Sequence, residues 1–240
     1  MSTTTIKTDF TPGVVVAFEG ADGTGKSRAL QFVRRQHRFK TGKLACALAQ
    51  PSDSQVGIEA KHPTRIPSAH TRALLFAADR AAVLEAEEQV LGDGGGLALR
   101  DRDAWWSSQV YQGIQWAVEI APGESPWQVH GFAEFQAWIR EINIHGRNPD
   151  LTIVLDVPVA ERERRLVARG TPRAPEEARS FQRLVAAEYR RLVGEVSGTT
   201  DYGRVVLLDA SGTPEQVGEA CWALVRAELD RAAAAKGGAS

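Results

Sequence analysis

Two kinds of hydrophobic pattern alternate along the chain. Short continuous apolar runs rich in β-branched residues, first at 14–18 and most clearly at 151–157, predict buried strands. Longer segments whose apolar residues recur every three or four positions predict helices between them. The remaining predicted strands are 43–49, 97–100 and 204–208. The predicted helices are one ending at Thr41-Gly42, a short one from Gln55, and the segments 68–91, 104–120, 127–145, 158–169, 176–193 and 213–232.

This alternation predicts an α/β fold, a parallel five-stranded sheet with helices on both faces. The sequence shows neither an internal repeat nor a linker long enough to divide it, so we expect one domain over 1–240 with disordered ends at about 1–11 and 233–240. Ligands of such sheets bind beyond the carboxyl ends of the strands. Three segments follow predicted strands and are expected to meet in one cleft: the glycine-rich segment 20–27, Gln50-Pro51 and Asp101-Arg102.

The glycine-rich segment carries the strongest chemical signal. It follows the first predicted strand, precedes a helix and fits the phosphate-loop pattern G-x-x-x-x-G-K-[ST] in full, which makes this a P-loop NTPase-type fold. Its glycines let successive backbone N–H groups point at a polyphosphate, and the helix start adds its positive dipole end. We therefore expect ATP on Gly20, Ala21, Asp22, Gly23, Thr24, Gly25, Lys26 and Ser27, with the lysine on the β- and γ-phosphates and the serine hydroxyl on Mg²⁺.

The composition of the chain excludes only a few classes of function. The formal net charge of the 240 residues is −1, so nothing global indicates binding to nucleic acid or to an anionic membrane. No apolar run reaches the length of a membrane span, and the first residues lack the apolar core of a signal peptide. Cys46 and Cys221 lie far apart in apolar surroundings without metal-ligand spacing. A reduced pair in a cytoplasmic protein is the expected state.

Several stretches together resemble the thymidylate kinase family, the P-loop enzymes that phosphorylate dTMP. They are FEGADGTGKS at 18–27, LLFAADRA at 74–81, DR at 101–102 with SSQVYQG at 107–113, and NPDLTIVLDV at 148–157. The resemblance implies transfer of a phosphoryl group from ATP·Mg²⁺ to dTMP, giving dTDP and ADP, by a homodimeric enzyme of nucleotide biosynthesis. The P-loop alone is unspecific, whereas the LLFAADR segment combined with the DR pair is much more specific.

The resemblance also implies roles for individual residues. Phe76 and Arg80, one helical turn apart, would stack on the base and contact the nucleotide, and Arg102 would hold the dTMP phosphate. Asp101 would join Ser27 in positioning Mg²⁺. Asp22 would contact the acceptor sugar and align the phosphates, with further substrate contacts from Pro51, Ser108 and Tyr111. Without the resemblance, Phe76 is more simply a core residue and Arg80 a solvated charge, and Asp22 and Tyr111 are open to the same alternative as turn and core residues.

A mobile lid is expected at about 169–176. The P-loop carries no arginine between its glycines, and in that variant of the family the lid supplies the arginines that cover the transferring group. Arg169 and Arg173 are the candidates, with Arg165 as another, and each is equally compatible with a solvated charge at a helix end. Some cation must offset the charge on the equatorial oxygens during transfer.

The sequence departs from the family pattern at two positions that bear on the acceptor. Gln50 replaces the acid that usually precedes the proline, and Asp103 replaces the Tyr or His that usually ends the DR triplet, placing a negative charge near the expected phosphate. Most of the tryptophans lie between Trp105 and Trp138, where they either pack the helical layer or reshape the acceptor pocket. Two alternatives stay open: a P-loop kinase with another nucleotide, nucleoside or small metabolite as acceptor, and a nucleotide-binding module with weak activity.

Overall fold

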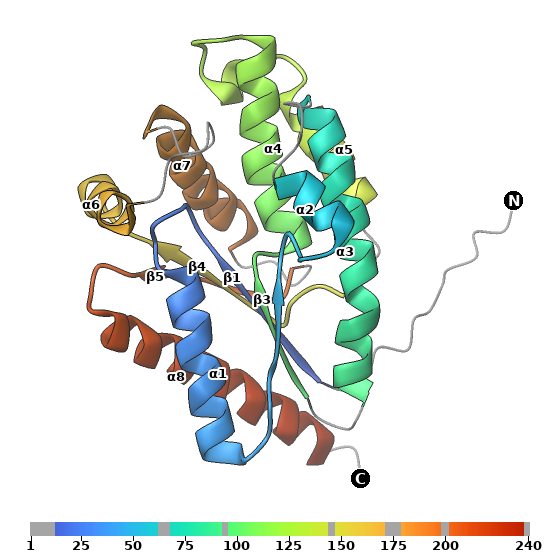
Figure 1. Cartoon of the computed structure of the whole chain (residues 1–240), viewed down its shortest axis with the longest axis vertical. Coiled ribbons are helices and arrows are strands. Elements are labelled where there is room, and N and C mark those ends of the chain that lie inside the picture. The colour runs from blue at the N-terminus through green and yellow to red at the C-terminus, as the bar shows by residue number, and fades with distance from the viewer. Residues whose placement is uncertain are drawn as a thin grey trace, which may run out of the picture.

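The computed structural model describes residues 13–61, 68–92, 96–143, 147–170, 179–197 and 202–237, which form a three-layer α/β structure (Figure 1). Its centre is a five-stranded sheet in the order β2-β3-β1-β4-β5, with every neighbouring pair parallel. The strands are β1 (Val14–Glu19), β2 (Cys46–Ala49), β3 (Leu97–Asp101), β4 (Leu151–Asp156) and β5 (Arg204–Asp209). The predicted fold class is therefore confirmed.

Helices cover both faces of this sheet (Figure 1). One face carries α1 (Lys26–Thr41) and α8 (Pro214–Gly237), which pack against each other. The opposite face carries α3 (Ala69–Gly92), α4 (Ala104–Ile120), α5 (Phe132–Ile142) and α7 (Arg179–Val196). The short α2 (Gln55–Lys61) packs on α3, the 3₁₀ turn η1 (Pro126–Gln128) precedes α5, and α6 (Val159–Arg169) follows β4.

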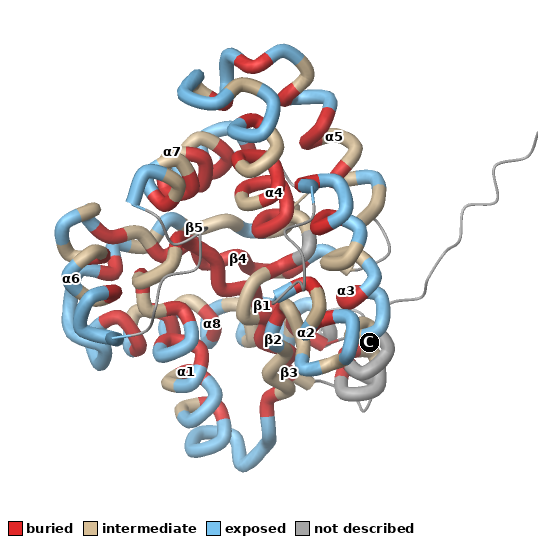
Figure 2. Tube along the Cα trace, turned by 45° about the horizontal axis from the view of Figure 1, so that its top comes forward, coloured by how far each residue is buried: buried red, intermediate tan, exposed pale blue. Residues whose placement is uncertain are grey.

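The central strand β1 is buried along its whole length, as its run of valines predicts. Figure 2 shows the buried segments concentrated in the sheet and on the inward sides of the helices. Val14, Val16 and Phe18 face the layer of α1 and α8, whereas Val15 packs with Leu91 of α3. Burial on both sides fixes the register of β1 and therefore the place where its carboxyl end meets the next loop.

The tryptophans between 105 and 138 pack among the helices. Trp106 is buried against α7, and Trp116 stacks on Phe135 with ring centroids 5.0 Å apart. Trp138 stacks on the same Phe135 ring, with centroids 5.4 Å apart. The packing interpretation of these residues accounts for their positions. Two are exceptions: Trp105 also lines a cavity next to Arg80, and Trp127 is 40% exposed.

Several predicted boundaries are wrong by a few residues. β2 begins at Cys46 rather than at 43, and α5 begins at Phe132 because η1 occupies the start of the predicted helix. α7 continues to Val196, and α8 continues to Gly237, beyond its predicted end at 232. The periodicity of apolar residues shows that an element exists more reliably than it shows where the element ends, because caps and tertiary contacts determine the ends. The residues 1–12 and 238–240 lie outside the described part of the chain.

Candidate active site

The P-loop joins the end of β1 to the start of α1. Gly20, Gly23 and Gly25 all have positive φ angles, of 130°, 85° and 98°. A side chain at Gly20 is also excluded by space, since a Cβ there would lie 2.3 Å from the carbonyl oxygen of Leu155. These conformations, which glycine adopts without strain, wrap the backbone around the N-terminus of α1. The loop therefore has the shape that an anion-binding helix start requires.

Lys26 folds back over this loop. Its Nζ donates hydrogen bonds to the carbonyl oxygens of Gly20 at 2.8 Å and Ala21 at 3.0 Å, and it lies 3.9 Å from a carboxylate oxygen of Asp22. Burial, together with the nearby positive charge of Arg102, lowers the pKa of the Lys26 ammonium to about 8. A buried cation held mainly by neutral carbonyls is well placed to exchange these contacts for phosphate oxygens.

Ser27 and Asp101 meet at the carboxyl ends of β1 and β3. The Ser27 hydroxyl donates a hydrogen bond of 2.6 Å to the Asp101 carboxylate. A hydroxyl and a carboxylate are hard oxygen donors of the kind that Mg²⁺ takes from P-loop proteins, with phosphates and water supplying the rest. The pair therefore fits the ion. No cluster of three or more His, Cys, Asp or Glu with metal-site geometry occurs in the described ranges.

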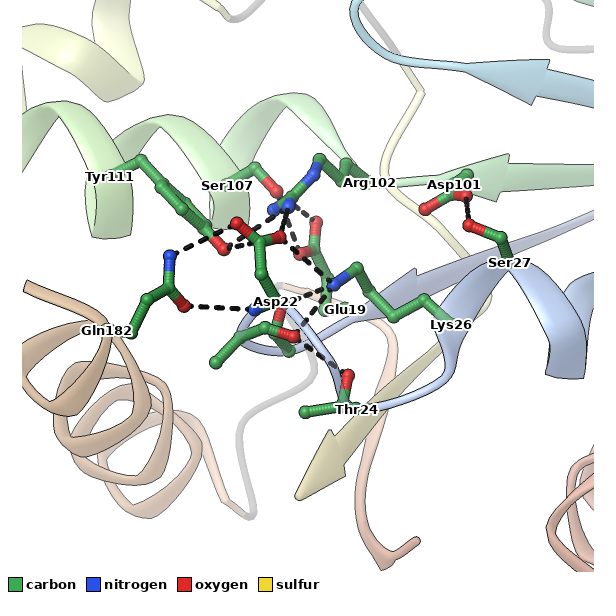
Figure 3. A network of polar contacts seen from close by, with 12 residues as sticks. Glu19, Asp22, Thr24, Lys26, Ser27, Asp101, Arg102, Ser107, Tyr111 and Gln182 are labelled. Carbon is green, nitrogen blue, oxygen red and sulfur yellow. Dashed lines mark hydrogen bonds and ion pairs between the residues drawn. The ribbon is translucent and has the colours of Figure 1, made fainter. Parts of the chain in front are cut away.

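Arg102 connects the P-loop to α4 (Figure 3). Its Nη2 donates to the Asp22 carboxylate at 2.5 Å and to the Tyr111 hydroxyl at 3.2 Å, and its guanidinium lies 4.5 Å from the centroid of the Tyr111 ring. Gln182 of α7 completes the cluster by accepting from the Asp22 backbone N–H and donating to its carboxylate. Three of the predicted residues thus lie together, and the sequence pattern missed the fourth.

The charges in this cluster support one another. Burial raises the pKa of the Asp22 carboxyl, but the neighbouring Arg102 and Lys26 outweigh burial and hold that pKa below its ordinary value. Arg102 is the one non-glycine residue with a positive φ, 77°, among the described residues. Such backbone conformations cost free energy and persist only where the surroundings impose them.

The surroundings that impose this conformation centre on Glu19, which no motif in the sequence indicated. This last residue of β1 has no exposed surface, and its carboxylate accepts hydrogen bonds from the Tyr189 hydroxyl at 2.6 Å, the Ser107 hydroxyl at 2.8 Å and the Asp103 backbone N–H at 2.5 Å. Burial raises the pKa of this carboxyl, with Arg102 opposing the effect. An acid at the end of an otherwise apolar strand was the available signal.

Asp103 is not a free charge at the acceptor position. It caps α4 by accepting from the Trp105 backbone N–H at 3.0 Å, and it pairs with Arg100 at 2.5 Å. Arg100 is also held by both oxygens of Glu87, at 2.6 and 2.7 Å. The negative charge expected near the phosphate is therefore compensated inside the protein.

Arg80 lines a second cavity, of about 320 Å³, and the side chains of Phe76 and Ser108 lie next to its guanidinium. The Arg80 guanidinium lies 5.7 Å from the Phe76 ring centroid and donates to the Ser108 hydroxyl at 2.6 Å. It also donates to the side-chain oxygens of Gln50 and Asn143, each at 2.9 Å. Pro51 follows Gln50 through a cis peptide bond. Asn143 is a further residue that the sequence pattern did not indicate.

A larger cleft of about 710 Å³ runs from the P-loop to α6 and to the segment that joins β5 to α8. Arg165 ties these parts together, because it donates to the carbonyl oxygens of Thr24 and Ala210 and pairs with Glu161. Arg169 lines the same cleft, as do Ser211 to Pro214, which no motif indicated. Arg173 and most of the expected lid lie outside the described residues.

The fold and this site define a P-loop nucleotide-binding protein with two cavities, one beside the P-loop and one beside Arg80. Residues 18–123 match the sequence model of the family described as thymidylate kinase. The chain is 29% identical to a thymidylate kinase of Bradyrhizobium diazoefficiens, covering 95% of this chain and 96% of the relative. It is 27% identical to one of Rhodopseudomonas palustris, with 90% of each chain covered.

A solved structure gives the same result for the fold. The thymidylate kinase of Candida albicans, reported with broad substrate specificity and a novel structural element, superposes with a TM-score of 0.70 at 18% identity, covering 90% of this chain and 92% of that chain. The family model and both relatives therefore agree that this chain is similar to thymidylate kinases, which are phosphotransferases.

Proposed function

We propose that this protein transfers the γ-phosphoryl group of ATP to dTMP, giving dTDP and ADP. The observation that carries the proposal is the contact of Arg102 with Asp22 at 2.5 Å. This contact brings Arg102, at the end of β3, directly against the loop that follows β1, which supports a role for Arg102 as the cation that binds the acceptor phosphate. Both phosphates can then lie in line, as direct transfer requires.

The donor side consists of the P-loop and the cleft beside it. The backbone of 20–27 and Lys26 would hold the β- and γ-phosphates, and the cleft along α6 would accept the remainder of ATP. Ser27 and Asp101 would hold Mg²⁺, which would offset phosphate charge when bound. Arg165, Arg169 and Arg173 are the candidates for covering the transferring group. The contact of Arg165 with the Thr24 carbonyl supports a place close to the P-loop.

The acceptor side consists of residues from α3, β3 and α4. Arg102 would bind the dTMP phosphate as a guanidinium fork, and Asp22 and Tyr111, which already contact Arg102, would orient it toward the donor. Phe76 would stack on the base, with Arg80 and Ser108 at its edge and Pro51 closing the pocket. Transfer then needs no covalent intermediate, because the attacking oxygen belongs to the bound phosphate.

We also propose an oligomeric state and a cellular location for the protein. Leu74 on α3 and Ile120 on α4 expose more than half of their side-chain surface, 52% and 59%, and a second copy of the chain would cover such residues in a homodimer. No helix in the described part of the chain is long and apolar enough to cross a membrane. A cytoplasmic enzyme of nucleotide biosynthesis is consistent with that finding and with two free cysteines.

The test is coupled ADP release with ATP·Mg²⁺ and a panel of dTMP, dUMP, dCMP, dGMP and dAMP. We expect turnover with dTMP, weaker turnover with dUMP, and a loss of about 10²-fold or more in kcat/KM for dTMP in Arg102→Ala. Arg226→Ala removes an equally charged but remote residue on α8 and serves as the matched control. An intact ATP site without turnover of any monophosphate would refute the proposal.

A further inference from the structure

Arg162 of α6 is a buried arginine that lines neither cavity. Only 1% of its surface is exposed, and its Nε and Nη1 atoms have no hydrogen-bond partner among the described residues. Asp156 and Glu163, whose charges act on it, already have arginine partners of their own. They lie 2.7 Å from Arg190 and 3.6 Å from Arg179, respectively. The charge of Arg162 therefore has no ion-pair partner in the described part of the chain.

This burial of Arg162 is costly. An arginine stays protonated at neutral pH, so the side chain carries its full charge in a place without solvent. Burial accordingly lowers the pKa of its guanidinium. A hydrocarbon side chain of similar length would avoid the cost of desolvating a charge and of leaving N–H donors unpaired. A buried charge kept in this form suggests a functional use for it.

Arg162 packs directly against the P-loop. A Cβ placed on Gly23 would lie 2.9 Å from the Cγ of Arg162 and 3.1 Å from its carbonyl oxygen. The absence of a side chain at Gly23 therefore lets the arginine approach the loop so closely. Tyr111, whose hydroxyl contacts Asp22 of the same loop, is the first of the groups that oppose the effect of burial on the Arg162 pKa. The electrostatic influence of Arg162 thus reaches the P-loop and a residue that contacts it.

The charged groups in the network of Figure 3 do not by themselves favour an anion. Its acids are Glu19, Asp22 and Asp101, and its cations are Lys26 and Arg102. Both cations face the same Asp22 carboxylate, at 3.9 and 2.5 Å. A polyphosphate brings several more negative charges to this place. A cation behind the loop raises the potential there without occupying the cleft, and its poorly solvated surroundings strengthen the effect.

We propose that Arg162 is an electrostatic positioning residue for the donor: its unpaired charge, held against Gly23, increases the affinity of the P-loop for the polyphosphate of ATP. The inference rests on the proposed function for the place of ATP. The P-loop of this chain has no arginine between its glycines, and Arg162 supplies a positive charge to the same loop from α6. It acts across the loop and does not touch the ligand, since it lines neither cavity.

The experiment compares Arg162→Met, which keeps much of the stem and removes the charge, with Arg162→Lys, which keeps the charge. Calorimetry at about pH 6.5, where the lysine is protonated, measures the binding of ATP·Mg²⁺ and of inorganic tripolyphosphate. For Arg162→Met we expect both affinities to fall by the same factor, about tenfold. The midpoint of urea unfolding should rise, because a buried unpaired charge is removed. Arg162→Lys should bind both probes within about threefold of the wild type. Arg226→Met, at an exposed position on α8, is the matched control.

The outcomes separate a role of the charge from a role in packing. Unchanged affinities in Arg162→Met, or equal losses in Arg162→Met and Arg162→Lys, overturn the proposal. A loss for ATP without a loss for tripolyphosphate also overturns it, because the charge would then act on the nucleoside. Lost affinity together with a lower unfolding midpoint in Arg162→Met would show that the side chain supports the loop by packing, which again overturns it.

The two probes also distinguish this inference from the proposed function. A wild-type protein that binds both probes but transfers no phosphoryl group to dTMP contradicts the proposed function and leaves the test of Arg162 intact. A wild-type protein that binds neither probe overturns both.

Discussion

Replacing Glu19 by Gln tests how the buried carboxylate under the P-loop is stabilised. The two carboxylate oxygens accept from three donors, namely the Asp103 N–H, the Ser107 hydroxyl and the Tyr189 hydroxyl. An amide that keeps its oxygen on the Asp103 N–H turns its NH₂ group toward the two hydroxyls, which must rotate and accept. Both hydroxyl bonds to a carboxylate are then replaced by weaker bonds to an amide, which costs about 1–2 kcal/mol of unfolding free energy at a pH where Glu19 is ionised.

The pH dependence of this cost follows from the pKa of Glu19, which burial raises above its ordinary value. Above the unfolded-state pKa, the native protein retains a proton on Glu19 that the unfolded chain has lost. The free energy of unfolding of the wild type therefore falls as pH rises toward the folded-state pKa, by at most about 1.4 kcal/mol per pH unit for this group. The amide of the Glu19→Gln variant does not titrate and has no such dependence. The advantage of the wild type over the variant is thus largest in acid and shrinks as pH rises.

Urea unfolding of both proteins at about pH 5, 6, 7 and 8 measures this difference directly, since other groups cancel between them. Glu215→Gln, the same exchange at an exposed position on α8, reports any effect of the chemical change itself. A difference that stays constant or grows with pH would refute the reasoning. The three donors and Arg102 would then stabilise the charged carboxylate more than burial destabilises it.

Two further predictions concern Lys26 and Asp103. The pKa of Lys26 is about 8 because of burial and of Arg102, so polyphosphate binding raises it, and ATP binding at about pH 8.5 should take up protons that are not taken up near pH 6.5. Calorimetry in buffers of different ionisation enthalpy measures the uptake, and equal uptake at both pH values would contradict the assignment. Asp103→Ala removes the cap of α4 and one carboxylate of Arg100, and should lower the unfolding free energy by about 2–4 kcal/mol. Asp103→Asn, which still caps the helix, should cost less than half of that in urea unfolding, and equal losses would show that the cap contributes nothing.

The sequence predicts the fold and the donor loop well because both depend on local pattern. The apolar runs identify all five strands. The glycines of 20–27 identify the loop that connects β1 to α1. Local pattern could not predict that Glu19 and Gln182 belong to the site, because their hydrogen-bond partners lie more than eighty residues away along the chain. The charge of Asp103 is visible in the sequence, but its pairing with Arg100 is not, because that pairing depends on how β3 meets α4.

Three arginines in this site show how partners decide what a cation can do. Arg100 forms ion pairs with Glu87 and Asp103, so its charge is neutralised within the protein and connects β3 to α3 and α4. Arg102 has a carboxylate partner too, but Asp22 belongs to the P-loop and lies at the cleft, so an arriving phosphate can compete for the same N–H groups. Arg80 is held by neutral side chains and can bind a carbonyl without first giving up an ion pair.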